Sequence, residues 1–181
     1  MANLQPQPTT DRSANILLDE EDQRERVLLV GIGEPVSTFA LDVSHVREVI
    51  RSRKTTRVPG SPGLLRGLVN VRGMVVTVLD LATCLGAGAS PAGDNAGNVT
   101  GTRAQMPGSI VLLEHGSRLV GLAVDHVREV RSLDDGGLVG QSSTDPLARG
   151  VVRGLASAGG EVVTLLDVAA LISRHLISGE S

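Results

Sequence analysis

Short apolar runs, each ended by a turn signal, make up most of the chain. Residues 27–32 and 36–43 are two such runs, and between them lie the turn formers Gly33, Glu34 and Pro35. Residues of the second run alternate between apolar and polar at a period of two, which is typical of a half-buried strand. This pattern predicts a β-hairpin near the start of the ordered chain.

A second hairpin is predicted further along. Prolines and glycines over residues 58–63 prevent a helix and permit a tight reversal of the chain. Two β-branched runs then follow, residues 68–71 and residues 74–79, separated by Arg72 and Gly73. Strand-forming runs joined by a two-residue link that contains glycine are typical of a hairpin.

Two aspartates are expected to cap helices. Asp80 ends the second run and precedes a short apolar helix that stops at Cys84, and Asp167 precedes the helix at the end of the chain. Aspartate is among the preferred N-cap residues because its carboxylate accepts a hydrogen bond from an unpaired backbone N–H group of the first turn. The closing helix has one apolar face, formed by Val168, Leu171, Ile172 and Leu176.

The chain repeats itself. VSHVREV, which begins at Val43, returns as VDHVREV at Val124, 81 residues later, with six of seven residues identical. VVTVLDL at Val75 returns as VVTLLDV at Val162, 87 residues later, with five of seven identical. Each copy is too small to bury a good core alone, so the repeat predicts two small β-barrels packed together.

These patterns divide the chain into segments. Residues 1–25 are rich in polar and acidic residues and are expected to be a disordered lead-in. One domain is then expected over residues 26–177, with one subdomain at about 26–85 and a second at about 109–177. The segment 86–108 is rich in Gly, Ala, Ser, Pro and Asn and reads as a flexible connection.

Composition narrows the class of protein. The chain has 181 residues, 41% of them hydrophobic, and Phe39 is its one aromatic residue, so the core must be aliphatic and β-branched, which favours sheet. The net charge of −3 argues against a non-specific nucleic-acid binder. No run of 18 apolar residues exists and the N-terminus lacks the pattern of a signal peptide, so we expect a soluble cytoplasmic protein that does not insert into a membrane.

Candidate metal and nucleophilic groups are sparse. The one cysteine, Cys84, lies in an apolar helical context and is expected to be an inert core residue. His45 and His126 occupy equivalent positions of the repeat, which indicates a structural role, and His115 and His175 are expected to be solvated. Because no group of these residues has metal-ligand spacing, we expect no metal, no cofactor and no catalytic residue.

The carboxylates and the basic loop leave alternatives open. Asp80 and Asp167 most simply act as caps, although a catalytic pair drawn from the two repeats is conceivable. The basic residues of segment 47–57 have no interleaved aromatic residues to stack on bases, so this loop is expected to be solvated or to face a partner.

One position of the repeat indicates a recognition surface. Arg72 aligns with Gly159, so the fold tolerates glycine there and does not require the arginine. An exposed Arg72 is expected to pair with Glu48 and to form a charged edge beside Val46 and Val71. An exposed ion pair contributes only about 0–1 kcal/mol to stability, which favours a role in binding a partner.

The order of the motifs is similar to one known family. FALDVSHVREV begins at Phe39, VP at Val58, RGLVNVRG at Arg66 and VTVLDL at Val76. In this combination the chain resembles the CheW family of bacterial chemotaxis coupling proteins over about residues 27–177.

The resemblance implies a mainly β fold of two SH3-like β-barrel subdomains in tandem, with short helices and a C-terminal helix. It also implies a non-catalytic adaptor that joins the cytoplasmic tips of chemoreceptors to the regulatory domain of a chemotaxis histidine kinase. The receptor-facing positions that it implies are Val46, Glu48 and Arg72, with Val71 beside them.

Two departures from the family keep other functions open. Residues 138–141 read LVGQ where the family usually has a proline-containing loop, and the connection 86–108 is long and rich in glycine. A scaffold of a surface-motility or development-linked pathway is therefore one alternative. A small-molecule-binding or hydrolytic β-barrel protein is a second, and a relative of the kinase's own C-terminal domain is a third.

Overall fold

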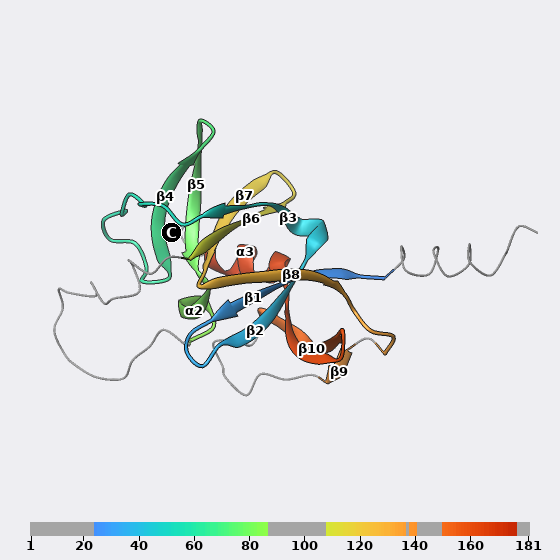
Figure 1. Cartoon of the computed structure of the whole chain (residues 1–181). Helices are drawn as coiled ribbons and strands as arrows, with labels where there is room; N and C mark the ends of the chain where they lie inside the picture. The colour runs from blue at the N-terminus through green and yellow to red at the C-terminus, as the bar shows by residue number, and fades with distance from the viewer. Residues whose placement is uncertain (1–23, 87–107, 137, 141–149, 177–181) are drawn as a thin grey trace, which may run out of the picture.

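The computed structural model describes residues 24–86, 108–136, 138–140 and 150–176 (Figure 1). Its elements follow in chain order: β1 (Arg26–Ile32), β2 (Ser37–Asp42), η1 (Val43–His45), β3 (Val46–Arg51), β4 (Leu65–Val71), β5 (Met74–Asp80), α2 (Leu81–Cys84), β6 (Ser109–His115), β7 (Arg118–Val124), β8 (His126–Ser132), β9 (Leu138–Gly140), β10 (Val152–Ala158), β11 (Glu161–Leu166) and α3 (Val168–Leu176). The predicted mainly β class, with short helices and a C-terminal helix, is confirmed. No helix in the described part of the chain is long and apolar enough to cross a lipid bilayer.

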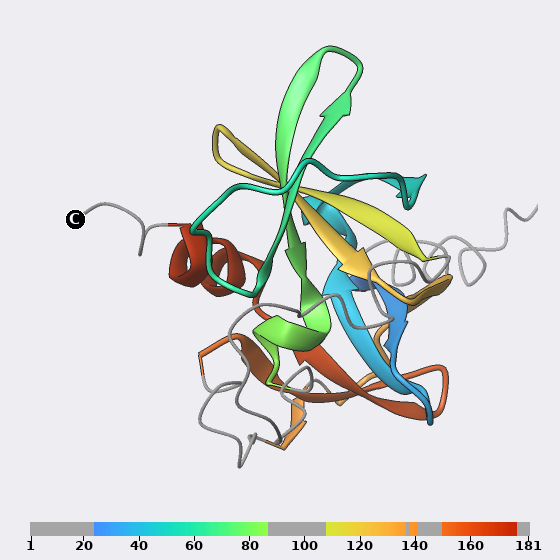
Figure 2. The same cartoon turned by 90° about the vertical axis from the view of Figure 1, so that its left-hand side faces the viewer.

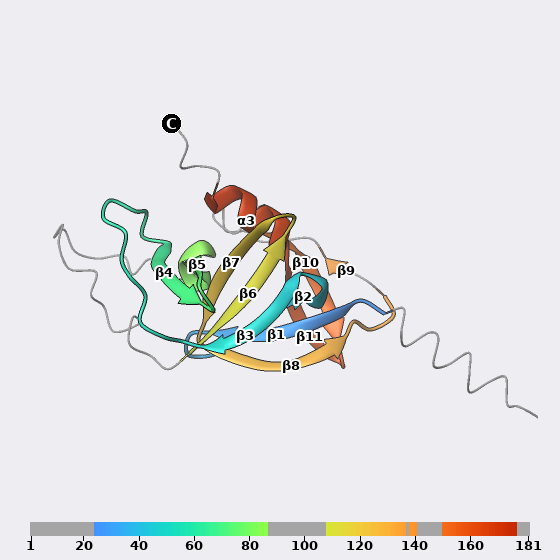
Figure 3. The same cartoon turned by 90° about the horizontal axis from the view of Figure 1, so that it is seen from above.

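The strands form two sheets. One sheet has six strands in the order β8-β1-β2-β11-β10-β9, and the other has five in the order β3-β6-β7-β5-β4. The five-stranded sheet lies above the six-stranded sheet in Figure 1, and Figure 2 shows the β4–β5 hairpin extending beyond the rest of its sheet. Figure 3, seen from above, places β4 and β9 at opposite ends of the molecule.

Each sheet takes strands from both halves of the sequence. The β1–β2 hairpin of the first half pairs in parallel with β11 of the second, where Phe39 lies opposite Thr164. The β6–β7 hairpin of the second half pairs in parallel with β5 of the first, where Leu79 lies opposite Leu122. The division between the sheets therefore differs from the expected contiguous subdomains, because each half lends its first hairpin to the other.

Three apolar clusters hold this arrangement together. One fills the concave side of the six-stranded sheet and includes Val27, Leu29 and Leu165, and its counterpart in the five-stranded sheet includes Val69 and Leu112. A third, larger cluster lies between the sheets and takes side chains from strands of both, from α2 and from α3. The apolar face of α3 closes this layer at the side of the molecule where the sheets meet (Figure 2), and its buried residues are Val168, Leu171 and Ile172.

The outer strands of each sheet approach one another through short backbone contacts. The segment after β3 returns to β4, and Thr56 and Leu68 exchange two N–H···O=C bonds of 2.8 Å. Gly67 permits this approach, since its φ is +138° and a Cβ there would lie 2.5 Å from the carbonyl oxygen of Thr56. In the other sheet the N–H of Asp134, which follows the outer strand β8, donates at 2.8 Å to the carbonyl of Ser157 on β10, the strand next to the outer strand β9. Among the described residues no ladder joins the outer strands of either sheet, so the two barrels are not closed.

The expected flexible segments lie mostly outside the described residues. Of the lead-in, Arg24 and Glu25 are described, and they form ion pairs with Asp135 at 2.9 Å and Arg153 at 2.7 Å, so these two residues belong to the folded domain. Most of the connection 86–108 lies outside the description. In the segment 138–141 the first three residues form β9.

Candidate functional site

The turn between β4 and β5 positions Arg72. Arg72 has a φ of +51° and Gly73 a φ of +87°, and two positive φ values in a two-residue link match the twist of a hairpin. The side chain of Asn70 accepts a hydrogen bond from the N–H of Gly73 at 2.9 Å and fixes the turn. Arg72 is the one described residue other than glycine with a positive φ.

Glu48 and Arg72 form the ion pair that the sequence predicts. The guanidinium Nη2 of Arg72 donates to Oε2 of Glu48 at 2.9 Å. The arginine side chain is 79% exposed and the glutamate side chain 26% exposed. The turn therefore presents a positive group to solvent above a carboxylate that lies closer to the protein.

The same turn in the second half is built differently. Gly159 and Gly160 occupy it with φ values of +60° and +79°. There Glu129, the repeat counterpart of Glu48, pairs with Arg131 of its own strand at 2.6 Å. Arg131 also packs over Gly159, where an added Cβ would lie 3.2 Å from its Nη1. In the first half, by contrast, the cation comes from the turn and is much more exposed.

Val71 does not lie on this surface. It is 3% exposed and belongs to the cluster on the concave side of the five-stranded sheet, because alternation along β4 turns it inward together with Val69. Val71 therefore packs in the core next to the turn and is not available for contact with a partner. The apolar surface beside the turn belongs to Met74, which is 43% exposed, and Val75, which is 69% exposed. Sequence reasoning placed both inside a hairpin strand and missed them.

A β-bulge separates Val46 from Glu48. Val46 lies opposite Leu113 and Glu48 lies opposite Leu112, so Arg47 is an extra residue on β3. Residues directly opposite one another in a sheet share a face, which places Val46 toward the layer between the sheets and Glu48 toward the concave side. Val46 packs partly against that layer. The sequence predicts these two side chains next to one another, and the structure keeps them near in the chain but on different faces.

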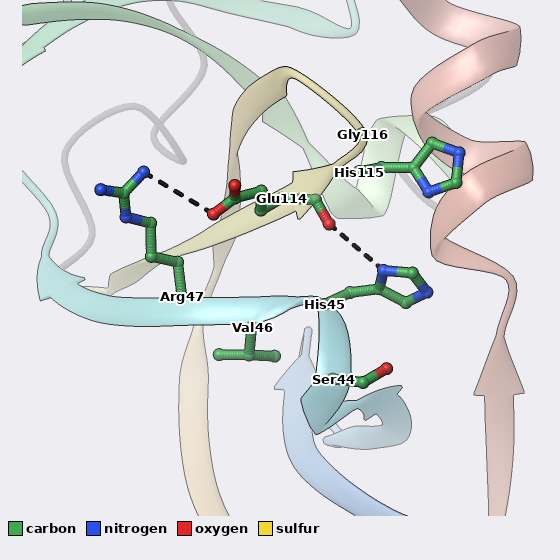
Figure 4. Close-up of a pocket in the computed structure, with 7 residues that line it drawn as sticks. All are labelled: Ser44, His45, Val46, Arg47, Glu114, His115 and Gly116. Carbon is green, nitrogen blue, oxygen red and sulfur yellow. Dashed lines mark hydrogen bonds and ion pairs between the residues drawn. The ribbon is translucent and has the colours of Figure 1, made fainter.

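Val46 also lines a cavity at the start of β3. The cavity has a volume of about 350 Å³ and lies between the η1–β3 junction and the β6–β7 turn. Figure 4 shows its lining residues, which are Ser44, His45, Val46, Arg47, Glu114, His115 and Gly116. His45 and His115 come together here, although 70 residues separate them in the sequence. Nothing in the spacing of the motifs indicates this meeting.

The two aspartates cap their helices. Oδ1 of Asp80 accepts hydrogen bonds from the N–H and the hydroxyl of Thr83, both at 2.9 Å, and Oδ1 of Asp167 accepts from the N–H of Ala170 at 2.8 Å. Cys84 is buried, and desolvation together with the charge of Asp80 raises the pKa of its thiol to about 12. A thiol with that pKa carries almost no thiolate near neutral pH, so Cys84 is a core residue and not a nucleophile.

The described residues offer several groups that a partner could contact. They hold no group of three or more His, Cys, Asp or Glu side chains able to share a metal ion. The two capping carboxylates are occupied by backbone and hydroxyl donors. What the site offers is an exposed ion pair, exposed aliphatic side chains and a shallow cavity.

Comparisons with known proteins agree with this description. Residues 26–175 match the family model described as the CheW-like domain. The probable chemotaxis protein CheW of Rhizobium etli is 29% identical over 138 residues, which cover 75% of this chain and 81% of that protein. The chemotaxis protein CheW of Klebsiella aerogenes is 25% identical over 142 residues, which cover 76% of each.

A solved structure has the same fold. The scaffolding protein TtCheW of Thermoanaerobacter tengcongensis superposes with a TM-score of 0.64 at 22% identity, over 83% of this chain and 88% of that one. The family model spans most of the chain, and it covers both sheets and the turn that carries Arg72. The chain therefore belongs to the CheW-like domain family.

Proposed function

We propose that this protein is a non-catalytic cytoplasmic adaptor that couples chemoreceptors to a chemotaxis histidine kinase. Its receptor-facing surface contains Glu48 and Arg72 and extends to Met74 and Val75 on the β4–β5 hairpin, and Val46 contributes from the other face of β3, across the bulge at Arg47. The kinase partner is the regulatory domain. This proposal joins the family membership to the surface on which Arg72 lies.

The conformation of Arg72 is the observation that carries the proposal. A residue with a Cβ in the left-handed region destabilises the folded state by roughly 1–2 kcal/mol, whereas an exposed ion pair stabilises it by about 0–1 kcal/mol. The second half of the chain makes the equivalent turn with glycine. Stability alone therefore does not explain an arginine at this turn, and a role in recognition does.

The surface fits a helical partner. In the family that the chain resembles, the partner at this surface is a helical receptor tip, and a helix docks through apolar side chains at spacings of three and four residues. Val75 is 69% exposed and supplies apolar area, and the Glu48–Arg72 pair sets the orientation of charged groups on the partner. Both charges are already placed before the partner arrives.

An adaptor of this kind needs no chemistry of its own. When it holds the receptor and the kinase at once, each acts at a high effective concentration for the other. A conformational bias in the receptor can then pass to the kinase through differences in contact free energy.

Binding measurements test the proposal. Purified protein should bind the receptor tip and the kinase regulatory domain encoded near its gene, and Arg72→Ala should weaken receptor binding and leave the fold intact. Arg153→Ala is the matched control, because it removes an exposed ion pair, with Glu25, on the other sheet. The proposal fails if the protein binds neither partner under conditions in which an established coupling protein binds both. The site assignment fails if Arg72→Ala and Arg153→Ala bind the receptor equally well.

A further inference from the structure

Two imidazole rings meet on the surface beside the cavity. His45 ends η1 and His115 ends β6, and the centres of their rings lie 5.6 Å apart with the ring planes tilted by 60°. In Figure 4 both rings project to one side of the β3–β6 pair, and the side chains of Arg47 and Glu114 project to the other.

A backbone contact fixes the tautomer of His45. Its Nδ1 lies 3.2 Å from the carbonyl oxygen of Glu114. A carbonyl oxygen only accepts, so in the neutral ring the hydrogen lies on Nδ1 and the lone pair on Nε2. Histidines that bind metals are usually held in this way, with one ring nitrogen donating to a carbonyl or carboxylate and the other bound to the ion.

The spacing of the rings matches a shared metal ion. Zinc binds imidazole nitrogen at about 2.0–2.1 Å in tetrahedral geometry, which places the centres of two bound rings about 5–5.5 Å apart. The observed separation of 5.6 Å lies just above this range.

The surroundings tolerate a cation. Arg47 would repel one, but its guanidinium is paired with the carboxylate of Glu114 at 3.6 Å. The cavity of about 350 Å³ beside the rings has room for water, and Ser44 and Gly116 line it. Because no three-member cluster of His, Cys, Asp or Glu occurs in the described part of the chain, water would complete the coordination.

We propose that His45 and His115 bind a divalent transition metal ion, such as Zn²⁺, as a two-imidazole site with water in the remaining positions. This site is separate from the Glu48–Arg72 pair, and the proposal does not depend on the adaptor function. The sequence gives no sign of it, because the two histidines belong to different halves of the chain.

Calorimetric titration of the full, tag-free chain with zinc chloride tests the site. One ion per chain should bind, and His45→Asn or His115→Asn should weaken binding roughly tenfold or more. His126→Asn is the matched control, because His126 is the repeat counterpart of His45 and is exposed on β8 without a histidine neighbour among the described residues. It should bind zinc like the unaltered chain.

Imidazole chemical shifts give a second readout. Zinc should move the ring signals of His45 and His115 and leave those of His126 in place, while circular dichroism shows that each variant is folded. The proposal is overturned if the chain binds no zinc. It is also overturned if the His45→Asn and His115→Asn variants bind zinc as tightly as the unaltered chain, which would assign the ion to other residues.

Discussion

Arg72 reaches Glu48 across the open edge of the five-stranded sheet, with 2.9 Å between Nη2 and Oε2. Glu48 lies on β3 and Arg72 follows β4, and these are the two outermost strands of that sheet. The pair therefore spans the gap that the backbone ladders leave open. The pair links two strands that are distant in the sheet order, and its arginine is 79% exposed.

Replacing Arg72 with glycine should leave stability nearly unchanged. The substitution removes a strain of roughly 1–2 kcal/mol, while the lost ion pair and the more flexible unfolded chain each cost up to about 1 kcal/mol. The free energy of unfolding, measured by urea titration, should stay within about 1 kcal/mol of the unaltered chain. A loss above about 2 kcal/mol would mean that Arg72 stabilises the turn by contacts and is needed for the fold.

Val71 and Val75 should respond in opposite ways. Val71→Ala removes buried volume and should cost about 1–3 kcal/mol of stability, with receptor binding retained once the folded fraction is taken into account. Val75→Ser lies on the surface and should change stability by less than about 0.5 kcal/mol while it weakens receptor binding. Thermal unfolding and receptor titration of both variants separate the two effects. Equal receptor affinity in the Val75→Ser variant would exclude Val75 from the binding surface.

The caps should be measurable one at a time. Asp80→Ala and Asp167→Ala should each lower the free energy of unfolding by about 0.5–2 kcal/mol, because each leaves a backbone N–H group of a first turn without its acceptor. Asp167→Asn is the control, since asparagine caps about as well as aspartate. If the alanine and asparagine variants of Asp167 unfold at the same denaturant concentration, the cap contributes nothing.

Asp134 should make the free energy of unfolding decrease at low pH. A hydrogen bond from Ser157, followed by the N–H groups of Gly160 and Gly159, lowers the pKa of its carboxyl group. A group with a lowered pKa in the folded state stabilises the fold above its unfolded pKa, about 3.9, and this contribution disappears as the pH falls through the folded value. The stability difference between the unaltered chain and Asp134→Asn should therefore be constant from pH 7 to about pH 5 and should shrink below about pH 4. Melting curves of both proteins at pH 7 and pH 3 give the comparison. If the stability difference between them is larger at pH 3 than at pH 7, the prediction is wrong.

Local features of the fold could be predicted from the sequence. The hairpin around Arg72, the two caps and the Glu48–Arg72 pair all depend on residues close in the sequence or on the repeat, where spacing carries the information. The alignment of Arg72 with Gly159 was enough to indicate an exposed position.

Features that depend on tertiary pairing could not be predicted. The bulge at Arg47 turns Val46 and Glu48 to different faces. A bulge is an extra residue relative to the partner strand, so it cannot be recognised until the pairing of β3 with β6 is known. Val71 belongs to a continuous apolar run, so its burial follows from which face of β4 is concave. The meeting of His45 and His115 likewise requires the pairing of β3 with β6.

The exchange of hairpins between the halves has a consequence for synthesis on the ribosome. β2 pairs with β11, more than 120 residues later, so the first hairpin has no neighbour on that side until β11 has emerged from the ribosome. Leu29 and Ala40 are buried against side chains of β10 and β11, so they stay without these contacts until both strands have been translated. Translation of β10 and β11 should thus be the step that completes the six-stranded sheet, and in a nascent chain stopped before β10 the β1–β2 hairpin should remain sensitive to protease.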